Sequence, residues 1–433
     1  MDEQRSVTRS ASRRRRKRRR IKLLPIVLLV GLAAAGFGGW KLLHERGESP
    51  SGKPANTATP AVSVPKASAT ATPQKSVAPS PSASASASPT PTATPSSTPA
   101  VGSATPAGAQ VKMAFVGDVI MASTVETLLQ KNGYDYPYKD VLPLLQSPDL
   151  TIANLETPIT KRGTAQSKEY VYKSPPEALP AFVDAGFDIV NLANNHSIDM
   201  GTEGLLDTFD ALDKAGIKRI GAGRDAKEAF SPVIVEKNGI RIAFLGFSRV
   251  VPEQSWKAGI NHPGVADTYS YVPAVAAIEA ARKDADLVVV SAHWGVERNS
   301  KPEPYQTDLA HRFIDAGADL VIGHHPHVLQ GFESYKGKWI AYSLGNFIFT
   351  TNEVKDTLET VVLQASCTKE RSCSLNAVPI FTQWAKPVVM NEADGKKLFN
   401  RLSGISFGAA VDEQGRVATK AKATSPSPKS SPK

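Results

Sequence analysis

The sequence predicts an α/β domain with a βαβ core and additional antiparallel strands, some of which we expect in a second sheet. Apolar runs of strand length alternate with helical patterns along most of residues 111–416. Lys237-Asn238-Gly239 separates two such runs and is typical of a β-hairpin turn. Two further strand-like runs, Trp339–Tyr342 and Thr360–Ala365, occur late in the chain.

The two kinds of element alternate in chain order. Strands are expected at Met113–Val116, Leu150–Ala153, Asp188–Leu192, Lys218–Ile220, Pro232–Val235, Ile240–Gly246, Leu287–Ser291 and Leu320–Ile322. Helices are expected at Thr124–Gln130, Pro176–Ala185, Gly204–Lys214, Ala274–Lys283 and Tyr305–Ala316. This alternation predicts parallel strands joined by helical crossovers.

The positive charge of the chain is concentrated in residues 1–22. This segment holds eleven Lys and Arg residues against two acids, a charge of +9, whereas the whole chain carries +10. The remainder is therefore almost neutral. An arginine-rich run is compatible with nucleic-acid binding, but the apolar segment that follows it indicates a cytoplasmic tail beside a membrane, and we expect no nucleic-acid partner.

Residues 23–43 are expected to form a single transmembrane signal anchor. Leu23 to Trp40 is a run of eighteen residues without a charged side chain, near the lower limit for a membrane-spanning helix. The preceding arginines favour a cytoplasmic N-terminus, which places the main domain outside the cell, at the cell membrane. The alternative is a signal peptide cleaved near Ala33-Ala34-Ala35. We favour the retained anchor because the segment is long and Lys41 closes it.

Residues 44–110 are dominated by Ser, Pro, Ala and Thr and are expected to be a disordered linker. Such a composition buries too little apolar surface to offset the entropy of ordering the chain. Its prolines make the linker semi-extended, so it would hold the folded domain away from the membrane. Residues 417–433 have the same character and are expected to be a disordered tail, which leaves 111–416 as the folded domain.

The two cysteines, Cys367 and Cys373, lie between two strand-like runs. In an exported domain they are expected to form a disulfide across a hairpin. Two free thiols are the alternative. A metal site at these cysteines is not expected, because no further Cys or nearby His completes a set of ligands.

Polar side chains follow five of the expected strands. They are Asp118, Glu156, the Asn194-Asn195-His196 cluster, His293, and the cluster of His324, His325 and His327. Side chains just past the carboxyl ends of parallel strands face the crevice where open α/β sheets bind ligands. Each motif alone is weak, but five at adjacent strand ends predict one shared site.

Carboxylate, amide and imidazole groups together suit one or two divalent ions such as Mn²⁺, Fe²⁺ or Zn²⁺. Two ions could share a bridging carboxylate, bind a phosphoryl oxygen and lower the pKa of a bound water. A nearby histidine would then protonate the leaving oxygen. The sequence shows neither a nucleophilic serine with its base nor a glycine-rich phosphate loop.

The ordered motifs resemble those of the CapA family, which is named for capsule synthesis, specifically poly-γ-glutamate. The resemblance spans about residues 112–349 and rests on Gly117-Asp118, Asn154-Leu155-Glu156-Thr157-Pro158, Leu192-Ala193-Asn194-Asn195-His196, His293-Trp294-Gly295, Gly323-His324-His325-Pro326-His327 and Tyr342-Ser343-Leu344-Gly345-Asn346-Phe347. The family is placed in the calcineurin-like metallophosphoesterase superfamily. This placement implies a two-sheet sandwich flanked by helices.

The resemblance also implies roles for individual residues. Asp118 resembles the first metal-binding Asp, and Glu156 stands where the superfamily has a bridging Asp. The remaining implied metal ligands are the amide of Asn195 and the imidazoles of His293, His325 and His327. His196 resembles the companion of that amide and is the candidate catalytic acid or phosphate contact.

One departure from the superfamily pattern concerns the first metal ion. The first motif of the superfamily is Asp-x-His, whereas Asp118 is followed by Val119 and Ile120. The first ion therefore loses a usual ligand. Either His324 replaces it or one ion suffices.

Further residues are candidates for contact with substrate. Asn194 and His324 belong to the clusters at the strand ends. Ser343 and Asn346 are expected either to touch substrate or to cap a turn. Lys173 is expected either to pair with an anionic substrate or to remain solvated.

Two functions follow from these observations. The first is a membrane-anchored extracellular metallohydrolase that acts on phosphoester-type bonds during capsule, poly-γ-glutamate or cell-envelope polymer biosynthesis. The second is a non-catalytic component of a capsule synthesis complex that binds or exports an anionic polymer through the same site. The preserved site residues favour the first hypothesis. The family name and the missing Asp-x-His histidine favour the second.

Overall fold

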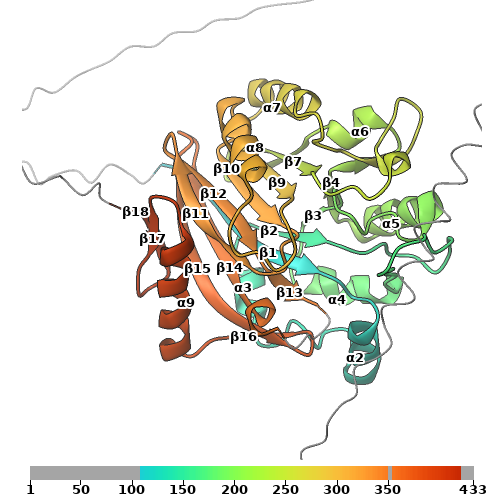
Figure 1. Ribbon diagram of the computed structural model, residues 1–433, viewed down its shortest axis with the longest axis horizontal. Helices are drawn as coiled ribbons and strands as arrows, with labels where there is room; N and C mark the ends of the chain where they lie inside the picture. The colour runs from blue at the N-terminus through green and yellow to red at the C-terminus, as the bar shows by residue number, and fades with distance from the viewer. Residues whose placement is uncertain (1–107, 350–353, 421–433) are drawn as a thin grey trace, which may run out of the picture. The chain divides into compact units, whose positions relative to one another are not determined.

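Two β-sheets packed face to face organise residues 108–349 and 354–420, the part of the chain that the computed structural model describes (Figure 1). Helices cover the outer faces of both sheets. The predicted α/β sandwich with a second sheet is therefore confirmed for this part of the chain.

The first sheet has ten strands and is mixed. Its parallel part consists of β1 (Gln110–Val119), β2 (Leu150–Leu155), β3 (Ile189–Asn191), β4 (Lys218–Ile220) and the short β13 (Asn346–Ile348), which pairs with β1. Its antiparallel part consists of β14 (Glu359–Thr368), β15 (Cys373–Gln383), β16 (Lys386–Val389), β17 (Ala409–Val411) and β18 (Arg416–Thr419). β18 continues three residues beyond the expected domain end at Arg416.

The second sheet has six strands in the order β11-β12-β10-β9-β7-β6. Parallel strands β7 (Ile240–Ser248), β9 (Leu287–His293), β10 (Leu320–His324) and β12 (Lys338–Leu344) form its centre, and antiparallel β6 (Val233–Lys237) and β11 (Leu329–Tyr335) form its edges. The hairpin predicted at Asn238-Gly239 is confirmed, because both residues have the positive φ that a tight turn requires. A separate two-stranded sheet pairs β5 (Ala222–Gly223) with β8 (Gly264–Val265).

Each sheet buries one face against the other sheet and one against helices. Between the sheets, Phe115 and Ile152 of the first sheet share a core with Ile242 and Phe244 of the second.

Helices α2 (Thr124–Asn132), α3 (Leu142–Gln146), α4 (Leu179–Asp184) and α5 (Gly201–Ala215) pack on the outer face of the first sheet. Helices α6 (Ala226–Phe230), α7 (Val272–Asp284) and α8 (Pro304–Asp315) pack on the second. Helix α9 (Glu392–Ile405) adds its apolar side to the core between the sheets. Three short 3₁₀ helices complete the fold: η1 (Pro176–Ala178), η2 (Gln254–Trp256) and η3 (Lys355–Leu358).

Cys367 and Cys373 are joined in a disulfide across the β14–β15 hairpin. The loop that this bond closes carries Arg371, whose guanidinium donates to the Asp319 carboxylate 2.7 Å away. Asp319 precedes β10, so the hairpin tip of the first sheet is bonded to the second sheet.

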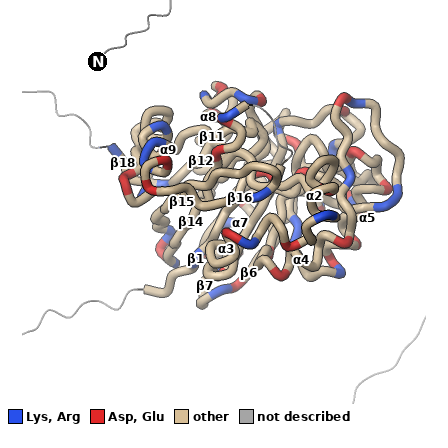
Figure 2. Tube along the Cα trace, turned by 90° about the horizontal axis from the view of Figure 1, so that it is seen from below, with Lys and Arg blue, Asp and Glu red and all other residues tan. Residues whose placement is uncertain are grey.

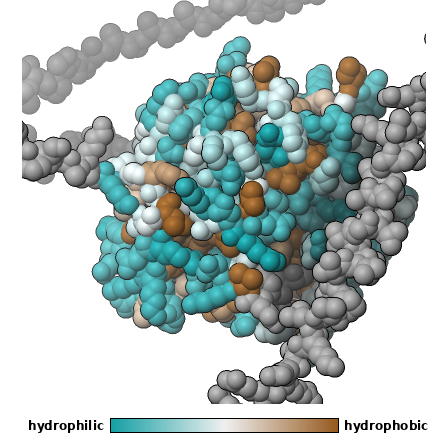
Figure 3. Space-filling model, viewed as in Figure 1, coloured by the Kyte–Doolittle hydropathy of each residue, from teal (hydrophilic) through white to brown (hydrophobic). Residues whose placement is uncertain are grey.

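The surface of the described domain mixes both signs of charge. Seen from below, Lys and Arg are interspersed with Asp and Glu, without a face of one sign (Figure 2). On the face seen in Figure 3, apolar residues form small patches among hydrophilic ones. The described residues include no helix with the length and hydropathy of a membrane span. The expected tail (1–22) and anchor (23–43) lie outside them, as do residues 44–107 of the expected linker (44–110) and residue 421 onward of the expected C-terminal tail. Gln110, the last residue of the expected linker, begins β1.

Two glycines allow the strands that carry the site to approach one another. A Cβ atom on Gly117 would lie 1.9 Å from the Gly345 carbonyl oxygen, and one on Gly323 would lie 2.0 Å from that of Tyr342. Both distances are far below van der Waals contact, and the obstacle is backbone. Gly117 and Gly323 directly precede Asp118 and His324, so the close approach sets where these side chains lie.

Replacing Gly117 with alanine is expected to destabilise the domain by about 3 kcal/mol, because the clash falls on backbone within a packed core. Urea unfolding monitored by circular dichroism measures this change. Gly404 is the matched control, since it is exposed in α9 and a Cβ there meets nothing within 4 Å. Gly404→Ala is expected to be neutral or stabilising by up to ~1 kcal/mol. Equal effects of the two substitutions would contradict this account.

Candidate metal centre

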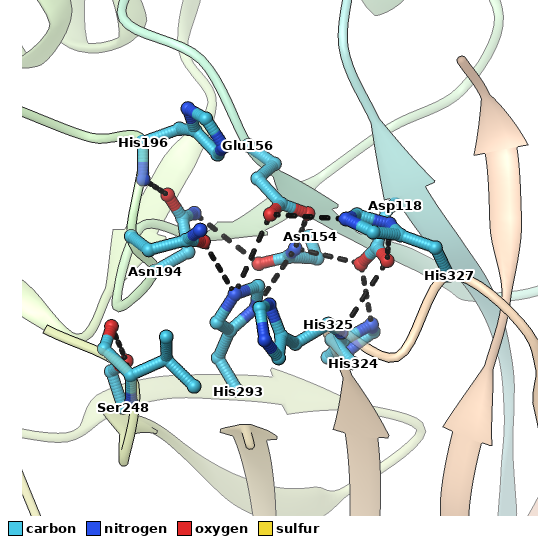
Figure 4. Close-up of polar contacts among 12 residues, drawn as sticks. Asp118, Asn154, Glu156, Asn194, His196, Ser248, His293, His324, His325 and His327 are labelled. Carbon is cyan, nitrogen blue, oxygen red and sulfur yellow. Dashed lines mark hydrogen bonds and ion pairs between the residues drawn. The ribbon is translucent and has the colours of Figure 1, made fainter. Parts of the chain in front are cut away.

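The carboxyl ends of the parallel strands of both sheets meet at one buried site (Figure 4). In the first sheet Asp118 of β1 lies opposite Asn154 of β2. In the second sheet His293 and His324 end the paired strands β9 and β10. All four side chains are buried. The convergence of strand ends therefore supplies carboxylate, amide and imidazole groups to one place.

Asp118 contacts side chains from both sheets. Its Oδ1 accepts a hydrogen bond from Asn154 Nδ2 at 2.8 Å, and its Oδ2 lies 3.1 Å from His327 Nδ1. Burial would raise the pKa of Asp118, but the hydrogen bond and positive charge of His327, together with the attraction of His324, hold the pKa below its usual value. Asp118 is therefore an ionised ligand group.

Glu156, just beyond β2, is the second buried carboxylate. Its Oε2 accepts from Asn154 Nδ2 at 3.1 Å, so one amide group donates to both carboxylates. Its Oε1 lies 3.5 Å from His293 Nε2 and has no hydrogen-bond partner. Burial, then repulsion by Asp118 and Glu297, raises the pKa of Glu156 well above its usual value. A buried oxygen without a partner costs free energy unless another group, such as a cation, satisfies it.

The histidines complete three overlapping sets of candidate ligands. The sets are Glu156 with His293 and His325, Asp118 with Glu156 and His327, and Glu297 with His325 and His327; within each set one ligand atom per residue lies within 4.8 Å of the others. The first two sets share Glu156. Glu156 is therefore a member of two ligand sets, and the bridging role that the family resemblance implies for it stays a prediction.

The imidazoles of the site are held mostly neutral. Burial lowers the pKa of His325 to about 3 and that of His324 to about 4. Burial and the surrounding histidines also lower the pKa of His293 well below its ordinary value. His327 differs: burial opposes its protonation, but the hydrogen bond and charge of Asp118 raise its pKa. Neutral imidazoles offer a lone pair to a metal ion, and His324 and His325 each keep a buried Nδ1 without a partner.

These observations fit a divalent metal ion. The donor set of carboxylate and imidazole groups suits Mn²⁺, Fe²⁺ or Zn²⁺. Glu156 and His325, which each have one buried atom without a hydrogen-bond partner, belong to the same ligand set. Asn195 Oδ1 lies 2.8 Å from His293 Nε2, so this amide oxygen adjoins the same set.

Two of the ligand histidines have strained backbones. His325 has a φ of 96° and His327 a φ of 57°, in a region that non-glycine residues rarely adopt. Such conformations cost on the order of 1 kcal/mol and persist where the surrounding structure imposes them. Here they turn both imidazoles towards the carboxylates.

His196 lies beside the ligand sets and is fixed by Asp199 and Lys168. Its Nδ1 lies 2.7 Å from Asp199 Oδ2, and Asp199 Oδ1 accepts from Lys168 Nζ at 2.8 Å. Lys168 Nζ, which only donates, also lies 3.1 Å from Nδ1, but the closer Asp199 carboxylate only accepts and so favours the proton on Nδ1. Nε2 has no hydrogen-bond partner among the described residues. The ring of Tyr172 covers the imidazole at 4.6 Å. Burial lowers the pKa of His196, with Asp199 opposing the shift.

The position that departs from the superfamily motif is apolar. Ile120 is fully buried, and its backbone N–H donates to the Ile348 carbonyl. His324 Nδ1 lies 3.6 Å from Asp118 Oδ1, so this imidazole adjoins the first carboxylate of the site. His324 belongs to none of the three ligand sets.

The expected substrate contacts lie in different surroundings. Asn194 is fully buried and holds Asn154, Leu155 and Ser197 in place through its amide. Ser343 Oγ caps a turn by accepting a hydrogen bond from the Gly345 N–H at 3.2 Å, and it donates to the Val328 carbonyl. Asn346 Oδ1 lies 2.9 Å from His327 Nδ1, so it orients that imidazole. Lys173 is exposed and lines a separate surface depression with Glu126 and Glu177.

Four residues near the site were not predicted as site residues: Asn154, Lys168, Asp199 and Glu297. Asn154 lies inside a quoted motif, two residues before Glu156, so its position at a strand end was a usable signal. Asp199 and Lys168 lie in irregular segments, where no periodicity shows which side chains turn inward.

The fold and site define a two-sheet α/β protein with a buried histidine–carboxylate centre suited to a divalent ion. The family model for the bacterial capsule synthesis protein PGA_cap matches residues 112–351, more than half of the chain. The chain therefore belongs to this family, and the resemblance inferred from the motifs is confirmed.

Two curated relatives agree with this assignment. The capsule biosynthesis protein CapA of Bacillus anthracis is 34% identical over 306 residues, which cover 68% of this chain and 73% of the relative. The PGA biosynthesis protein CapA of Bacillus subtilis (strain 168) is 35% identical over 310 residues, which cover 70% of this chain and 80% of the relative.

Solved structures show more distant likenesses. The Haemophilus influenzae NAD nucleotidase NadN has a TM-score of 0.41 at 12% identity, covering 70% of this chain and 64% of that one. The Thermus thermophilus sulfate thiohydrolase SoxB has a TM-score of 0.38 at 12% identity, covering 66% and 57%. At these TM-scores the likenesses assign no activity to this chain.

Glu156→Gln is expected to stabilise the metal-free protein while weakening metal binding. Because the pKa of Glu156 is raised in the folded state, its contribution to stability is present at low pH and lost as pH rises through that pKa. Glutamine removes this loss. At neutral pH the metal-free variant is therefore expected to exceed the wild type by roughly 1 kcal/mol, and the difference narrows as pH falls.

Denaturant unfolding at several pH values in the presence of a chelator measures the change, and titration with Mn²⁺ measures the affinity. Glu236→Gln, an exposed position on β6, is the control and is expected to alter neither. A metal-free Glu156→Gln protein less stable than the wild type, or one with unaltered affinity for Mn²⁺, would contradict the assignment.

Proposed function

We propose that this chain is a membrane-anchored accessory protein of capsule, poly-γ-glutamate or cell-envelope polymer biosynthesis that hydrolyses a phosphoester-type bond. The polymer assignment is supported by the family and by the names of the two Bacillus relatives. The hydrolytic assignment is supported by one observation: two candidate ligand sets share Glu156, and His196 lies beside them with a free nitrogen.

Six residues of the site are proposed to hold or adjoin the metal in such a reaction. Asp118, Glu156, His293, His325 and His327 would hold the metal, with the Asn195 amide beside them. When bound, a divalent ion polarises a phosphoryl oxygen and lowers the pKa of a water. Burial of these groups excludes bulk water and strengthens each electrostatic contact.

His196 is the residue proposed to move a proton. Asp199 favours the tautomer with the proton on Nδ1, so Nε2 first takes a proton from the attacking water and then gives that proton to the leaving oxygen. Lys168 holds Asp199 and also donates to the Asn195 carbonyl at 2.7 Å. Lys168 is therefore a positioning residue that couples the acid to the amide beside the metal ligands.

The alternative is a non-catalytic role in which the same site binds polymer within a capsule synthesis complex. The observation that favours it is Ile120, an apolar residue where the superfamily motif has a ligand. Under this alternative the site binds metal and polymer without turnover.

We propose the same arrangement in the cell that the sequence predicts. Residues 1–22 remain in the cytoplasm, residues 23–43 span the membrane, and the segment that follows links the anchor to an extracellular domain, in which β1 begins at Gln110 and β18 ends at Thr419. The disulfide between Cys367 and Cys373 supports an oxidising compartment. An assay on intact cells tests the placement, because a charged phosphodiester does not cross the membrane; activity that appears only after lysis would contradict it.

Hydrolysis of bis(p-nitrophenyl) phosphate by the full-length chain with Mn²⁺ tests the catalytic proposal. We expect turnover that a chelator abolishes. His196→Ala is expected to lower kcat by about 100-fold or more while metal remains bound, since general acid catalysis contributes about 10²–10⁴-fold.

Two lysines of one loop provide a matched comparison. Lys168→Met is expected to lower kcat about tenfold or more, because it frees Asp199 and His196, whereas Lys173→Met leaves turnover unchanged. Bound metal with no turnover of any phosphoester would favour the polymer-binding alternative. Equal effects of the two lysine variants would remove the positioning role of Lys168.

A further inference from the structure

A small cavity opens beside the metal centre. Its volume is about 230 Å³, and His196 and His327 form part of its wall. Aromatic rings flank both imidazoles: Tyr172 lies 4.6 Å from His196, and Phe349 lies 4.7 Å from His327. Tyr170, with 59% of its surface exposed, lines the same cavity. The cavity therefore connects solvent to the proposed acid between walls that combine aromatic rings with charged and polar side chains.

Arg298 is the single Lys or Arg among the described residues that line this cavity. Its guanidinium forms no ion pair or hydrogen bond with any residue in the described part of the chain, although most arginines of the domain are paired. The one carboxylate in the lining, Glu297, belongs to a candidate ligand set with His325 and His327. Glu297 is therefore a candidate metal ligand, and its carboxylate forms no ion pair with Arg298.

The backbone of Arg298 is strained in the same way as the ligand histidines. Its φ is 61°, and its N–H donates to the Pro326 carbonyl at 2.7 Å. Pro326 lies between His325 and His327, so the Arg298 loop is tied to the ligand loop. Strained conformations that the surrounding structure imposes are concentrated at functional sites. Here the strain holds a cationic side chain beside the proposed acid.

We infer that Arg298 binds an oxyanion, a carboxylate or a phosphate, of the substrate unit next to the reacting group. A guanidinium forms paired hydrogen bonds with either oxyanion. The cavity is smaller than the roughly 300–1,000 Å³ pockets that enclose whole small-molecule ligands. One unit of an extended chain fits it better than a complete ligand.

This inference rests on the proposed function for the identity of the reacting group, whereas binding at Arg298 is measurable without turnover. Two probes separate the sources of the oxyanion: a γ-linked triglutamate carries carboxylates, and a tri(glycerol phosphate) carries phosphodiesters. Isothermal titration of the full-length chain with each probe gives the affinities.

Arg298→Gln is expected to weaken the probe that the wild type binds by at least tenfold, and Arg298→Lys is expected to recover only part of the loss. Arg298→Gly keeps the positive φ without strain, so it should lose binding with no fall in melting temperature. Arg241→Gln is the matched control, because Arg241 is exposed at the opposite end of β7 from the site.

Loss of triglutamate binding identifies a carboxylate chain as the ligand, and loss of glycerol phosphate binding identifies a phosphate chain. The inference is overturned if Arg298→Gln and Arg298→Gly bind both probes as the wild type does, or if the wild type binds neither. A wild type that turns over no phosphoester, yet loses probe binding on Arg298→Gln, would refute the hydrolase and leave this subsite intact.

Discussion

Asp118 and Glu156 place two carboxylates in the interior of the domain, where like charges repel and water cannot screen them. The structure relieves this repulsion only in part. Asn154 donates to both groups and His327 lies against Asp118, but Glu156 Oε1 has no partner. A buried oxygen without a partner destabilises the folded protein, and proteins retain such groups where function requires them. Binding of a cation is the requirement that this arrangement of donors meets.

The fold supplies the positions that this constraint demands. Parallel strands of two sheets end at one place, and Gly117 and Gly323 let their backbones approach closely enough for side chains of both sheets to meet. The positive φ values of His325, His327 and Arg298 show that the loops after these strands are bent towards the site at a cost in backbone energy. Positive φ also occurs at turns elsewhere in the domain, but at this location it coincides with buried charge, and that combination is typical of a functional site.

Much of the fold follows from patterns in the sequence. The alternating strands and helices, the hairpin at Asn238-Gly239 and the second sheet are present in the structure because local hydrophobic periodicity and turn chemistry agree with the tertiary arrangement. Side chains that bind ligands often follow the carboxyl ends of parallel strands, and this rule correctly predicted that Asp118 and His293 lie close together. These features depend on local sequence and on one general property of parallel sheets.

The parts of the site that lie in irregular loops could not be predicted in this way. Lys168 and Lys173 occupy one loop, and only Lys168 turns towards Asp199. No periodicity distinguishes them, because a loop has no repeating face. Asn346 was expected to touch substrate or cap a turn, yet it orients His327 through a contact between segments nineteen residues apart. Such contacts depend on tertiary packing that a single sequence does not encode locally.

The central claim is that the converging strand ends form a divalent-ion site. The most direct measurement is the metal content of the full-length chain after expression with Mn²⁺, Fe²⁺ and Zn²⁺ supplied together, determined by inductively coupled plasma mass spectrometry beside His293→Ala. We expect one or two ions per chain in the wild type and a reduced content in the variant, because His293 belongs to a ligand set with Glu156. A folded wild type that retains none of the three metals would contradict the claim.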